Sequence, residues 1–414
     1  MGRIILQIDA CKNTGSTGKI SEDIGRVAIK HGWNSWKVYS RMRQDNQPSK
    51  SHLIATGTKV GFYLSVLETR LFDNHCLGLS NIYSTKQLIR KIDEINPDII
   101  QLHDIKGYFL NIKTLFEYLS TKKIPVVWTM HSCWQFTGHC GHFDHIGCER
   151  WKEGCYNCPL KKGYPESWLI DRSKRNWREK RALFTSVDKM TLVPVSDWLS
   201  GFVADSFLKD VPRVVIHNGI DINDFCIKSE QETKSVKNKY GIEDKFTILG
   251  VAAPWTKLKG IEDYYKLREL LPEDCQIVMV GLSESQLERL PKGIVGIKRT
   301  ESREEMAALY TLADLFFNST YEDNFPTVNI EALACGTPVC TYQTGGSVEA
   351  IDTETGFVIS QGGYAKLPEI VNQIKEKGKD YYQEKCRKRA VTHYDKDKCF
   401  EEYMGLYDKI LANK

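Results

Sequence analysis

The chain has 414 residues, and 41% of them are hydrophobic, which is enough for a large buried core and, by length, for two domains. Its 57 basic and 53 acidic residues are spread along the chain and leave a formal net charge of +4, so the composition gives no sign of a nucleic-acid-binding protein. No apolar run approaches the ~18 residues that a membrane-spanning helix needs.

The amino-terminal sequence MGRIILQIDACKNTGSTGK becomes polar and glycine-rich after a short apolar run, which favours a buried first strand over a signal peptide. Short β-branched runs then alternate with amphipathic segments, a pattern typical of parallel strands buried on both faces. We therefore predict an α/β fold in two halves, with strands at residues 3–8, 98–103, 125–131, 190–196, 213–218, 246–252, 276–281, 293–298 and 315–319.

The two halves predict two domains, residues 1–210 and 211–395. The polar stretch 227–245 reads as a solvated helix or loop that opens the second half. The closing helix, 396–414, carries one apolar stripe that must dock on the rest of the protein, and we expect it to pack back on the first domain. The stripe consists of Phe400, Tyr403, Met404, Tyr407 and Ile410.

The strongest functional signal is the segment 321–346, YEDNFPTVNIEALACGTPVCTYQTGG. Pro326 suits the first turn of a helix and Gly336 its left-handed cap, so residues 327–335 are predicted to form a short helix between two strands. The amino terminus of such a helix favours a phosphate. Glu331 lies on this helix and Asp323 lies eight positions earlier, although a single glutamate on a helix is commonly just solvated.

Other residues of the second half favour the same ligand. Lys257 and Lys259 follow the predicted strand 246–252, where a cation can meet a diphosphate. Gly345 and Gly346 leave room for the backbone to approach a ligand closely.

These motifs together resemble the retaining glycosyltransferases of family 4. The resemblance covers nearly the whole chain and rests on TGSTGK, INPDIIQLHDIKGYFLN, WTMHSCWQFTGHC, VPVSDWL, VIHNGIDINDF, KLKG and DNFPTVNIE followed by ALACGTPV. It implies the GT-B architecture, in which two Rossmann-like domains with parallel sheets face each other across a cleft that holds a nucleotide-sugar. It also points to bacterial surface-polysaccharide assembly.

The resemblance assigns roles to matching positions. It makes Glu331 the partner of the donor ribose, Lys259 the cation that neutralises the donor diphosphate, and Asp323 the carboxylate that faces the donor sugar. The remaining positions are Glu322 as an alternative carboxylate, Lys257 in place of an arginine common in relatives, Thr327 at the helix start, Gly345 and Gly346 in the diphosphate or sugar pocket, His131 near the reacting carbon, and Gly15 and Gly18 in a first-domain loop facing the donor.

From these roles we expect a hexose-type sugar to pass from a nucleotide-diphosphate sugar to a lipid-linked or growing oligosaccharide, with retention inherited from the family. A lysine and helix amides can stabilise the leaving diphosphate without a divalent metal, so no catalytic cofactor is expected. A phosphorylase or epimerase of the same architecture stays open as an alternative. A P-loop NTPase is disfavoured, because Asn13 and Ile20 break its phosphate-loop pattern.

The segment 133–160 departs from the rest of the chain, since Cys140, Cys148, Cys155 and Cys158 are spaced by seven, six and two residues. The last pair is zinc-like and the first spacing is wider than usual, so three readings stay open: structural zinc, reduced or redox-labile thiols, and a catalytic metal. Further candidate ligands are Cys133, His139, His142 and His145. Some family members resembling this chain carry the same insertion, which places it on the acceptor side.

The thirteen cysteines are an odd number, and most of them sit singly in apolar surroundings, which predicts a cytoplasmic protein. Residues 61–72 and 175–184 combine apolar, aromatic and basic residues. They predict either contact with the inner surface of the cytoplasmic membrane or ordinary packing on their own domain. The Asp395-x-Asp397 pair lies in the charged tail and is expected at the surface.

Overall fold

The structure is a computed structural model, and it describes residues 2–42 and 47–412. The chain divides into two compact units: unit 1 extends to His217 and resumes at Phe400, and unit 2 is Asn218–Cys399. The predicted boundary at residues 210/211 falls before this division. Within the described residues, no helix is both long enough and apolar enough to cross a membrane.

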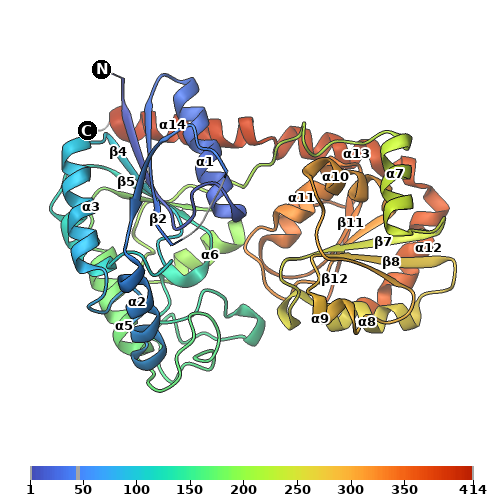
Figure 1. The fold of residues 1–414 in the computed structure, drawn as a ribbon, viewed down its shortest axis with the longest axis horizontal. Helices are drawn as coiled ribbons and strands as arrows, with labels where there is room; N and C mark the ends of the chain where they lie inside the picture. Colours follow the sequence, from blue (N-terminus) through green and yellow to red (C-terminus); the bar gives the residue numbers. More distant parts are fainter. Residues whose placement is uncertain (1, 43–46, 413–414) are drawn as a thin grey trace. The chain divides into compact units, whose positions relative to one another are not determined.

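Unit 1 is built on a six-stranded parallel sheet in the order β3-β2-β1-β4-β5-β6 (Figure 1). Its strands are β1 (Ile4–Ile8), β2 (Asn34–Ser40), β3 (His52–Thr56), β4 (Ile99–Leu102), β5 (Val126–Met130) and β6 (Met190–Pro194). Its helices are α1 (Gly15–Lys30), α2 (Lys59–Phe72), α3 (Ile82–Ile95), α4 (Ile112–Ser120), α5 (Ser173–Phe184) and α6 (Asp197–Asp205), with the 3-10 turns η1 (Cys133–Gln135) and η2 (Asp144–Ile146).

Two features of unit 1 differ from the expectation. The run 213–218 is not a strand, although the amides of Val214 and Ile216 do donate to Leu192 and Pro194 of β6. Residues 34–40 and 52–56 form strands that were not predicted, because β2 and β3 interleave polar residues with apolar ones and lie at one side of the sheet.

Unit 2 repeats the design, with the strand order β12-β11-β10-β7-β8-β9. Its strands are β7 (Phe246–Val251), β8 (Cys275–Val280), β9 (Ile294–Ile297), β10 (Leu315–Asn318), β11 (Val339–Tyr342) and β12 (Gly356–Ile359). Its helices are α7 (Glu230–Tyr240), α8 (Ile261–Leu270), α9 (Glu284–Leu287), α10 (Arg303–Leu312), α11 (Thr327–Ala334), α12 (Leu367–Lys377) and α13 (Lys379–His393), with 3-10 turns η3 (Lys257–Lys259), η4 (Gly345–Ala350) and η5 (Tyr364–Lys366). Figure 1 shows α8 and α9 on one side of this sheet and α10 and α11 on the other.

The closing helix α14 (Lys396–Ala412) enters unit 1 at Phe400. Its stripe is buried there: Tyr403 and Tyr407 are 1% and 0% exposed. The Tyr403 hydroxyl lies 3.1 Å from Thr129 Oγ1, and the Tyr407 hydroxyl donates to Gln101 Oε1. The helix therefore docks through hydrogen bonds to two polar residues of β4 and β5 as well as through its apolar side chains.

Both sheets have a topological switch point. There the strand order reverses: the strands on one side of this point were added toward one edge of the sheet, and those on the other side toward the opposite edge. In unit 1 the switch lies between β1 and β4, and in unit 2 it lies between β7 and β10. Ligands of doubly wound sheets bind at the carboxyl ends of the strands on either side of such a point. The residues that follow β1, β4, β7 and β10 are therefore the first place to look for a functional site.

Candidate functional site

In unit 2, the switch point brings together Lys259 and Asp323. Lys259 ends the turn η3 after β7, and Asp323 lies in the loop after β10. Lys259 Nζ donates to Asp323 Oδ2 at 2.7 Å and to Thr320 Oγ1 at 3.4 Å. An ammonium has three N–H groups, so these two bonds leave a third for a ligand oxygen.

Gly345 and Gly346 pack against the backbone of the same loop. Gly345 has φ +53°, and a Cβ there would lie 1.8 Å from the Asp323 carbonyl oxygen. The Gly346 amide donates to that oxygen at 3.2 Å. Since no side chain fits at Gly345, this glycine permits an approach of η4 to Asp323 that any other residue would block.

The helix α11 begins at Thr327, with Pro326 as the residue before its first turn, and ends before Gly336, which has φ +80°. The helix spans 327–334, one residue shorter than predicted, and Thr327 is partly buried at its start. The Asn329 amide donates to the Pro326 carbonyl at 3.2 Å. The amides that precede it, at the start of the helix, favour an anion.

A buried polar network holds α11 against η4 and two strands. Asn329 Oδ1 accepts from Asn318 Nδ2 at 2.7 Å, and Asn329 Nδ2 donates to the carbonyl and hydroxyl oxygens of Ser347, both at 3.0 Å. Thr341 Oγ1 lies 2.6 Å from Ser347 Oγ. All four side chains are buried, so each hydrogen bond satisfies a polar group whose burial without a partner would lower stability. Together these bonds fix the position of α11 relative to η4.

The other predicted residues of unit 2 make contacts of their own, away from the Lys259–Asp323 ion pair. Glu331 lies on α11 and accepts a hydrogen bond of 3.0 Å from the buried Tyr310 hydroxyl. Burial, and then the Glu331 carboxylate, raise the pKa of Tyr310. Glu322 is 4% exposed and so faces the protein interior. Lys257 points to solvent, with a side chain that is 87% exposed and 3.5 Å from Glu262.

In unit 1, Gly15 and Gly18 were predicted in a loop, but they lie in the first turn of α1, the helix that follows β1. Gly15 begins α1 with φ +66° and is exposed, whereas Gly18 is buried, and a Cβ there would lie 2.9 Å from Cys11 Cβ. The Gly18 carbonyl accepts from Lys37 Nζ at 3.0 Å, and this ammonium lies 3.9 Å from Glu22 Oε2. Lys37 and Glu22 are both buried, so a charged pair supports this turn from below.

Asp9, the residue directly after β1, completes this buried cluster. Its carboxylate accepts from the Cys11 amide at 3.1 Å and from Ser21 Oγ at 3.0 Å. Burial raises the pKa of Asp9 to about 6, and the nearby Lys37 opposes that rise.

His131 follows β5 and is oriented by a second histidine. The rings of His103 and His131 are stacked, with His103 Nδ1 3.4 Å from His131 Nε2, and His103 Nε2 lies 3.0 Å from Gln7 Oε1. Burial lowers the pKa of His131 to about 4 and that of His103 well below its usual value. Since Gln7 Oε1 only accepts, His103 must donate from Nε2, and its Nδ1 then accepts the Nε2 proton of His131.

Asp104 and Lys106 follow β4 beside these histidines. Lys106 Nζ donates to Asp104 Oδ1 at 2.6 Å and to Ser132 Oγ at 3.3 Å. Ser132 therefore contacts the Lys106–Asp104 ion pair. The side chain that contacts the His131 ring nitrogen is His103.

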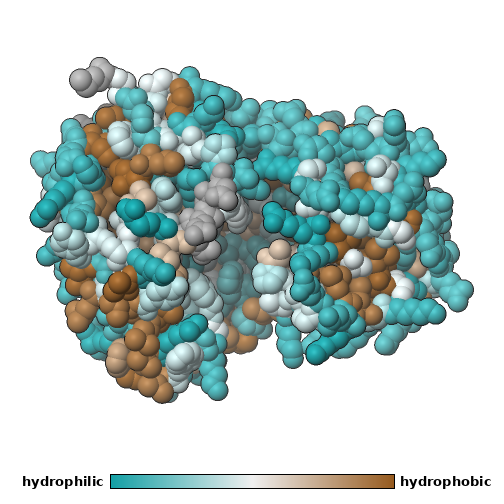
Figure 2. Space-filling model, viewed as in Figure 1, coloured by the Kyte–Doolittle hydropathy of each residue, from teal (hydrophilic) through white to brown (hydrophobic). Residues whose placement is uncertain are grey.

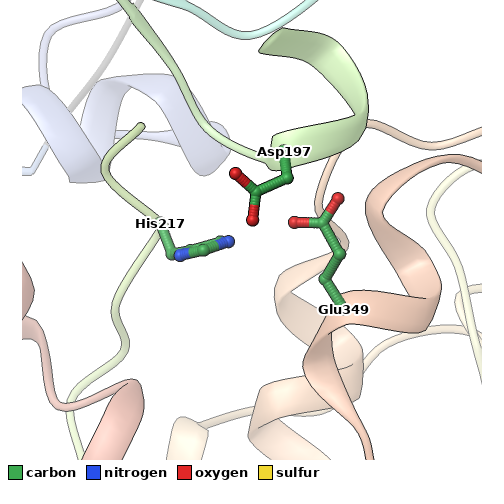
Figure 3. Close-up of side chains that lie close together, drawn as sticks. All are labelled: Asp197, His217 and Glu349. Atoms are coloured by element: carbon green, nitrogen blue, oxygen red, sulfur yellow. The ribbon is translucent and has the colours of Figure 1, made fainter. Parts of the chain in front are cut away.

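Asp197 and His217 lie near the carboxyl end of β6. Asp197 is the first residue of α6, and its carboxylate comes within 4.8 Å of a ring nitrogen of His217 (Figure 3). Figure 3 also draws Glu349, which belongs to η4 in unit 2. Asp397, in contrast, is exposed in the first turn of α14, where its amide donates to Asp395 Oδ1 at 3.1 Å.

Sequence reasoning did not find several residues of these clusters. It passed over Asp9, Lys37, Glu22 and His103 in unit 1 and the Asn329–Ser347 pair in unit 2. A charged lysine in the middle of the strand NSWKVYS was a signal, because a buried charge inside a sheet needs a partner. His103 stood at the end of a predicted strand, 98–103, as His131 did at the end of 125–131.

Two family models match adjacent parts of the chain. The model described as Glycosyltransferase Family 4 matches residues 41–224, and the model described as Glycosyl transferases group 1 matches residues 232–392. Together they match parts of both units. The strands β1 and β2 and the helix α1 lie before the first matched residue.

Known proteins match over most of their length. The colanic acid biosynthesis glycosyl transferase WcaC of Escherichia coli is 26% identical over 98% of this chain and 100% of its own. The N,N'-diacetylbacillosaminyl-diphospho-undecaprenol alpha-1,3-N-acetylgalactosaminyltransferase of Campylobacter jejuni is 25% identical over 67% of this chain and 77% of its own.

Among solved structures, the HepE protein of Anabaena in complex with UDP-glucose superimposes with a TM-score of 0.69 at 14% identity, covering 99% of this chain and 100% of the other. This likeness shows the fold. With the two family models and two parallel Rossmann-like sheets, it confirms the expectation: the chain belongs to the family 4 type of glycosyltransferases, which have the GT-B fold.

Proposed function

We propose that this glycosyltransferase moves a hexose-type sugar, with retention, from a nucleotide-diphosphate sugar to a lipid-linked or growing oligosaccharide in polysaccharide biosynthesis. The observation that carries the proposal is the contact of Lys259 with Asp323 at the unit 2 switch point, with the two glycines of η4 packed on the same loop. A cation, a glycine turn and a helix amino terminus gathered at one sheet edge suit a diphosphate.

In this proposal the leaving group is stabilised by the protein itself. The bond between the anomeric carbon and the diphosphate oxygen breaks, and the acceptor hydroxyl oxygen bonds to that carbon on the same face. The hydroxyl proton leaves with the diphosphate. The third N–H of Lys259 and the first amides of α11 meet the charge that develops on the diphosphate, which needs no divalent cation.

The names of two relatives support the proposed acceptor class. WcaC is named for colanic acid biosynthesis, and the Campylobacter jejuni enzyme for an acceptor linked to diphospho-undecaprenol. A lipid-linked acceptor requires access to a membrane surface. Unit 1 has an exposed apolar surface that suits such a contact.

That surface is formed by α2 and the loop 164–170. The Trp168 amide donates to the Arg70 carbonyl at 2.6 Å, and the Arg70 guanidinium lies 5.0 Å from the Trp168 ring centroid, so loop and helix are one surface. Figure 2 shows hydrophobic side chains gathered over α2. The exposed apolar residues are Val60, Tyr63, Leu64, Leu67, Phe72, Tyr164, Trp168, Leu169 and Ile170.

The second segment proposed for lipid contact, 175–184, is excluded as an apolar surface. In α5, Trp177 and Phe184 are 5% and 0% exposed, and the Trp177 indole donates to the Trp151 carbonyl at 2.8 Å. This helix packs on its own unit. We therefore propose α2 with the loop 164–170 as the part of unit 1 that rests on the inner face of the cytoplasmic membrane.

Titration calorimetry tests the donor site. UDP, GDP and ADP are titrated into the wild-type chain, Lys259→Ala and Lys257→Ala. We expect one of the nucleotides to bind the wild type and Lys257→Ala with similar affinity, and to bind Lys259→Ala at least about tenfold more weakly. Absence of binding at millimolar nucleotide would overturn the proposal.

Product analysis tests the reaction. A screen of donors with an undecaprenyl-linked acceptor, read by mass, separates transfer from the epimerase and phosphorylase alternatives, which yield an isomerised sugar nucleotide or a sugar phosphate. The anomeric coupling constant of the product measures retention, and an inverted product contradicts that part.

Flotation with vesicles containing anionic lipid tests the membrane surface. The double variant Leu64→Glu/Leu67→Glu is expected to stay at the bottom of the gradient while wild type floats. Val358→Glu, at an exposed apolar residue of unit 2, is the matched control. A wild-type chain that stays at the bottom removes this surface from the proposal.

A further inference from the structure

The segment between β5 and α5 has little regular structure of its own. It contains only the 3-10 turns η1 and η2 in about forty residues of the described chain. A small aromatic cluster holds part of it, with the Phe136 and Trp151 ring centroids 5.1 Å apart and those of Phe143 and Trp151 5.3 Å apart. Loop-rich segments with so small a core are usually stabilised by a covalent or metal link.

Four cysteines and one histidine of this segment line the same cavity, which has a volume of about 20 Å³: Cys140, Cys148, Cys155, Cys158 and His139. That volume admits one small guest. No three of these sulfur and nitrogen atoms, all of which the structure describes, lie within 4.8 Å of one another, so binding one ion requires the loop to draw them together. The Gly138 amide donates to Cys155 Sγ at 3.2 Å. Cys155 and Asn157 have φ +41° and +45°, so the chain between the last two cysteines turns back on itself.

His139 adds an observation that is independent of the cysteines. Its ring is 2% exposed, its Nδ1 lies 2.6 Å from Asp73 Oδ1, and its Nε2 is buried with no hydrogen-bond partner. A buried polar atom left without a partner costs about 1 to 3 kcal/mol, so something is expected to meet it. A carboxylate that orients an imidazole is the usual surrounding of a metal centre.

The cavity also has a counter-charge for an anionic cluster. Lys180 is 1% exposed, and its ammonium donates to the carbonyl oxygens of Trp134 at 2.8 Å and Thr137 at 3.0 Å. Cys140 and Cys155 are among the groups that act on it electrostatically. A buried cation is costly unless negative charge lies nearby, and four thiolates around one divalent ion carry a net charge of −2.

We propose that this cavity is a structural zinc site in which Cys140, Cys148, Cys155 and Cys158 bind one Zn²⁺ as thiolates. Soft sulfur donors select zinc over magnesium or calcium, which take oxygen ligands. His139, held by Asp73 through Nδ1, lines the same cavity as the four thiolates. Four protein ligands leave no open position, so the metal staples the segment that directly follows His131 and does no chemistry.

Metal analysis of the untagged full-length chain tests the proposal. After gel filtration, inductively coupled plasma mass spectrometry is expected to find one zinc per wild-type chain and less than about a fifth of that in Cys140→Ser or Cys158→Ser, each of which removes a thiolate ligand. Cys226→Ser, at a partly exposed cysteine of unit 2, is the matched control and keeps its zinc. A wild-type chain that stays metal-free after refolding with zinc overturns the proposal.

Two further measurements do not depend on the variants folding. X-ray absorption at the zinc edge of the wild-type chain is expected to show sulfur ligands alone, and His139→Ala is expected to keep the metal with affinity weakened about 10- to 100-fold. A nitrogen in the first coordination shell, or complete loss of zinc in His139→Ala, overturns the four-thiolate assignment. A Cys140–Cys158 disulfide found by mass mapping in the purified chain overturns the metal itself.

Discussion

The residues at the two switch points are held in place by different kinds of interaction. In unit 2, the Lys259–Asp323 pair is partly exposed, with 36% and 24% of the side chains accessible, and its surroundings are held by a buried network of neutral side chains. In unit 1, the groups are themselves charged and buried: Asp9 directly after β1 and Lys37 in the middle of β2 both lie at 0% exposure, and Lys37 bonds to the first turn of α1.

The difference shows how each site is assembled. Residues 318–347 supply nearly all of the unit 2 network from two strands, one helix and one turn, so the arrangement is local in sequence. The unit 1 cluster needs β1, β2, β4 and β5, whose residues are far apart in the chain and meet only in the sheet. A neutral network tolerates solvent nearby, whereas buried charges depend on every partner being present.

The largest effect is expected from removing the unit 2 cation. Lys259→Ala should lower kcat/KM about 100- to 1000-fold, because it deletes a charge aimed at the leaving diphosphate. Lys257→Ala, which removes an exposed lysine paired only at 3.5 Å with Glu262, should change kcat/KM by about fivefold at most. Steady-state kinetics with the active donor measure both. Equal losses in the two variants would mean that the pair formed with Asp323 has no special role.

A second pair of variants compares the histidines of unit 1. His131→Gln should lower kcat about 100-fold, because it alters the side chain expected at the reacting carbon. His103→Gln should have a smaller effect on kcat, about tenfold, since His103 only positions His131. Single-turnover rates separate chemistry from product release. A larger loss for His103→Gln would reverse these roles.

The buried network around Asn329 in unit 2 is expected to contribute to the stability of the fold. Asn329→Ala leaves Asn318 and Ser347 without their partner and should reduce the free energy of unfolding by about 2 to 3 kcal/mol. Asn223→Ala, at an exposed asparagine of the same unit, should change it by about 0.5 kcal/mol or less. Urea unfolding curves measure both changes. Similar values for the two would show that the network does not hold α11.

The smallest effect concerns pH. The folded-state pKa of His131, about 4, lies below the usual 6.5, so its contribution to stability is complete above pH 6.5 and is lost as pH falls through 4. Asp9 has the opposite sign, since its raised pKa of about 6 makes its contribution fade as pH rises from 3.8 to above 6.

The difference between wild type and His131→Gln isolates the histidine, because Asp9 is common to both. Between pH 7 and pH 4, wild type should lose about 2 kcal/mol more free energy of unfolding than the variant. Urea titrations at several pH values measure this difference. Parallel pH profiles would show that the ring is not held neutral by burial.

Much of the fold was readable because it rests on local patterns. Apolar runs of strand length predicted β1, β4, β5, β6 and β7 to β10, and Pro326 with Gly336 bounded α11 to within one residue. The extended run 213–218 satisfied the same pattern without forming a strand, and the mixed β2 and β3 were missed, because apolar content does not say which segments enter the sheet.

By itself, then, the sequence determined the two α/β halves, the docking stripe of α14, and the motif that places Asp323 in the loop before α11 and Glu331 on that helix. Only the tertiary structure decided that Lys259, not Lys257, meets Asp323, that His103 orients His131, and that His139 shares a cavity with four cysteines. The physical reason is that secondary structure follows from residue spacings of two to four, which can be read along the chain. These contacts instead join strand ends and turns that are far apart in the sequence, and local spacing does not determine which of them meet.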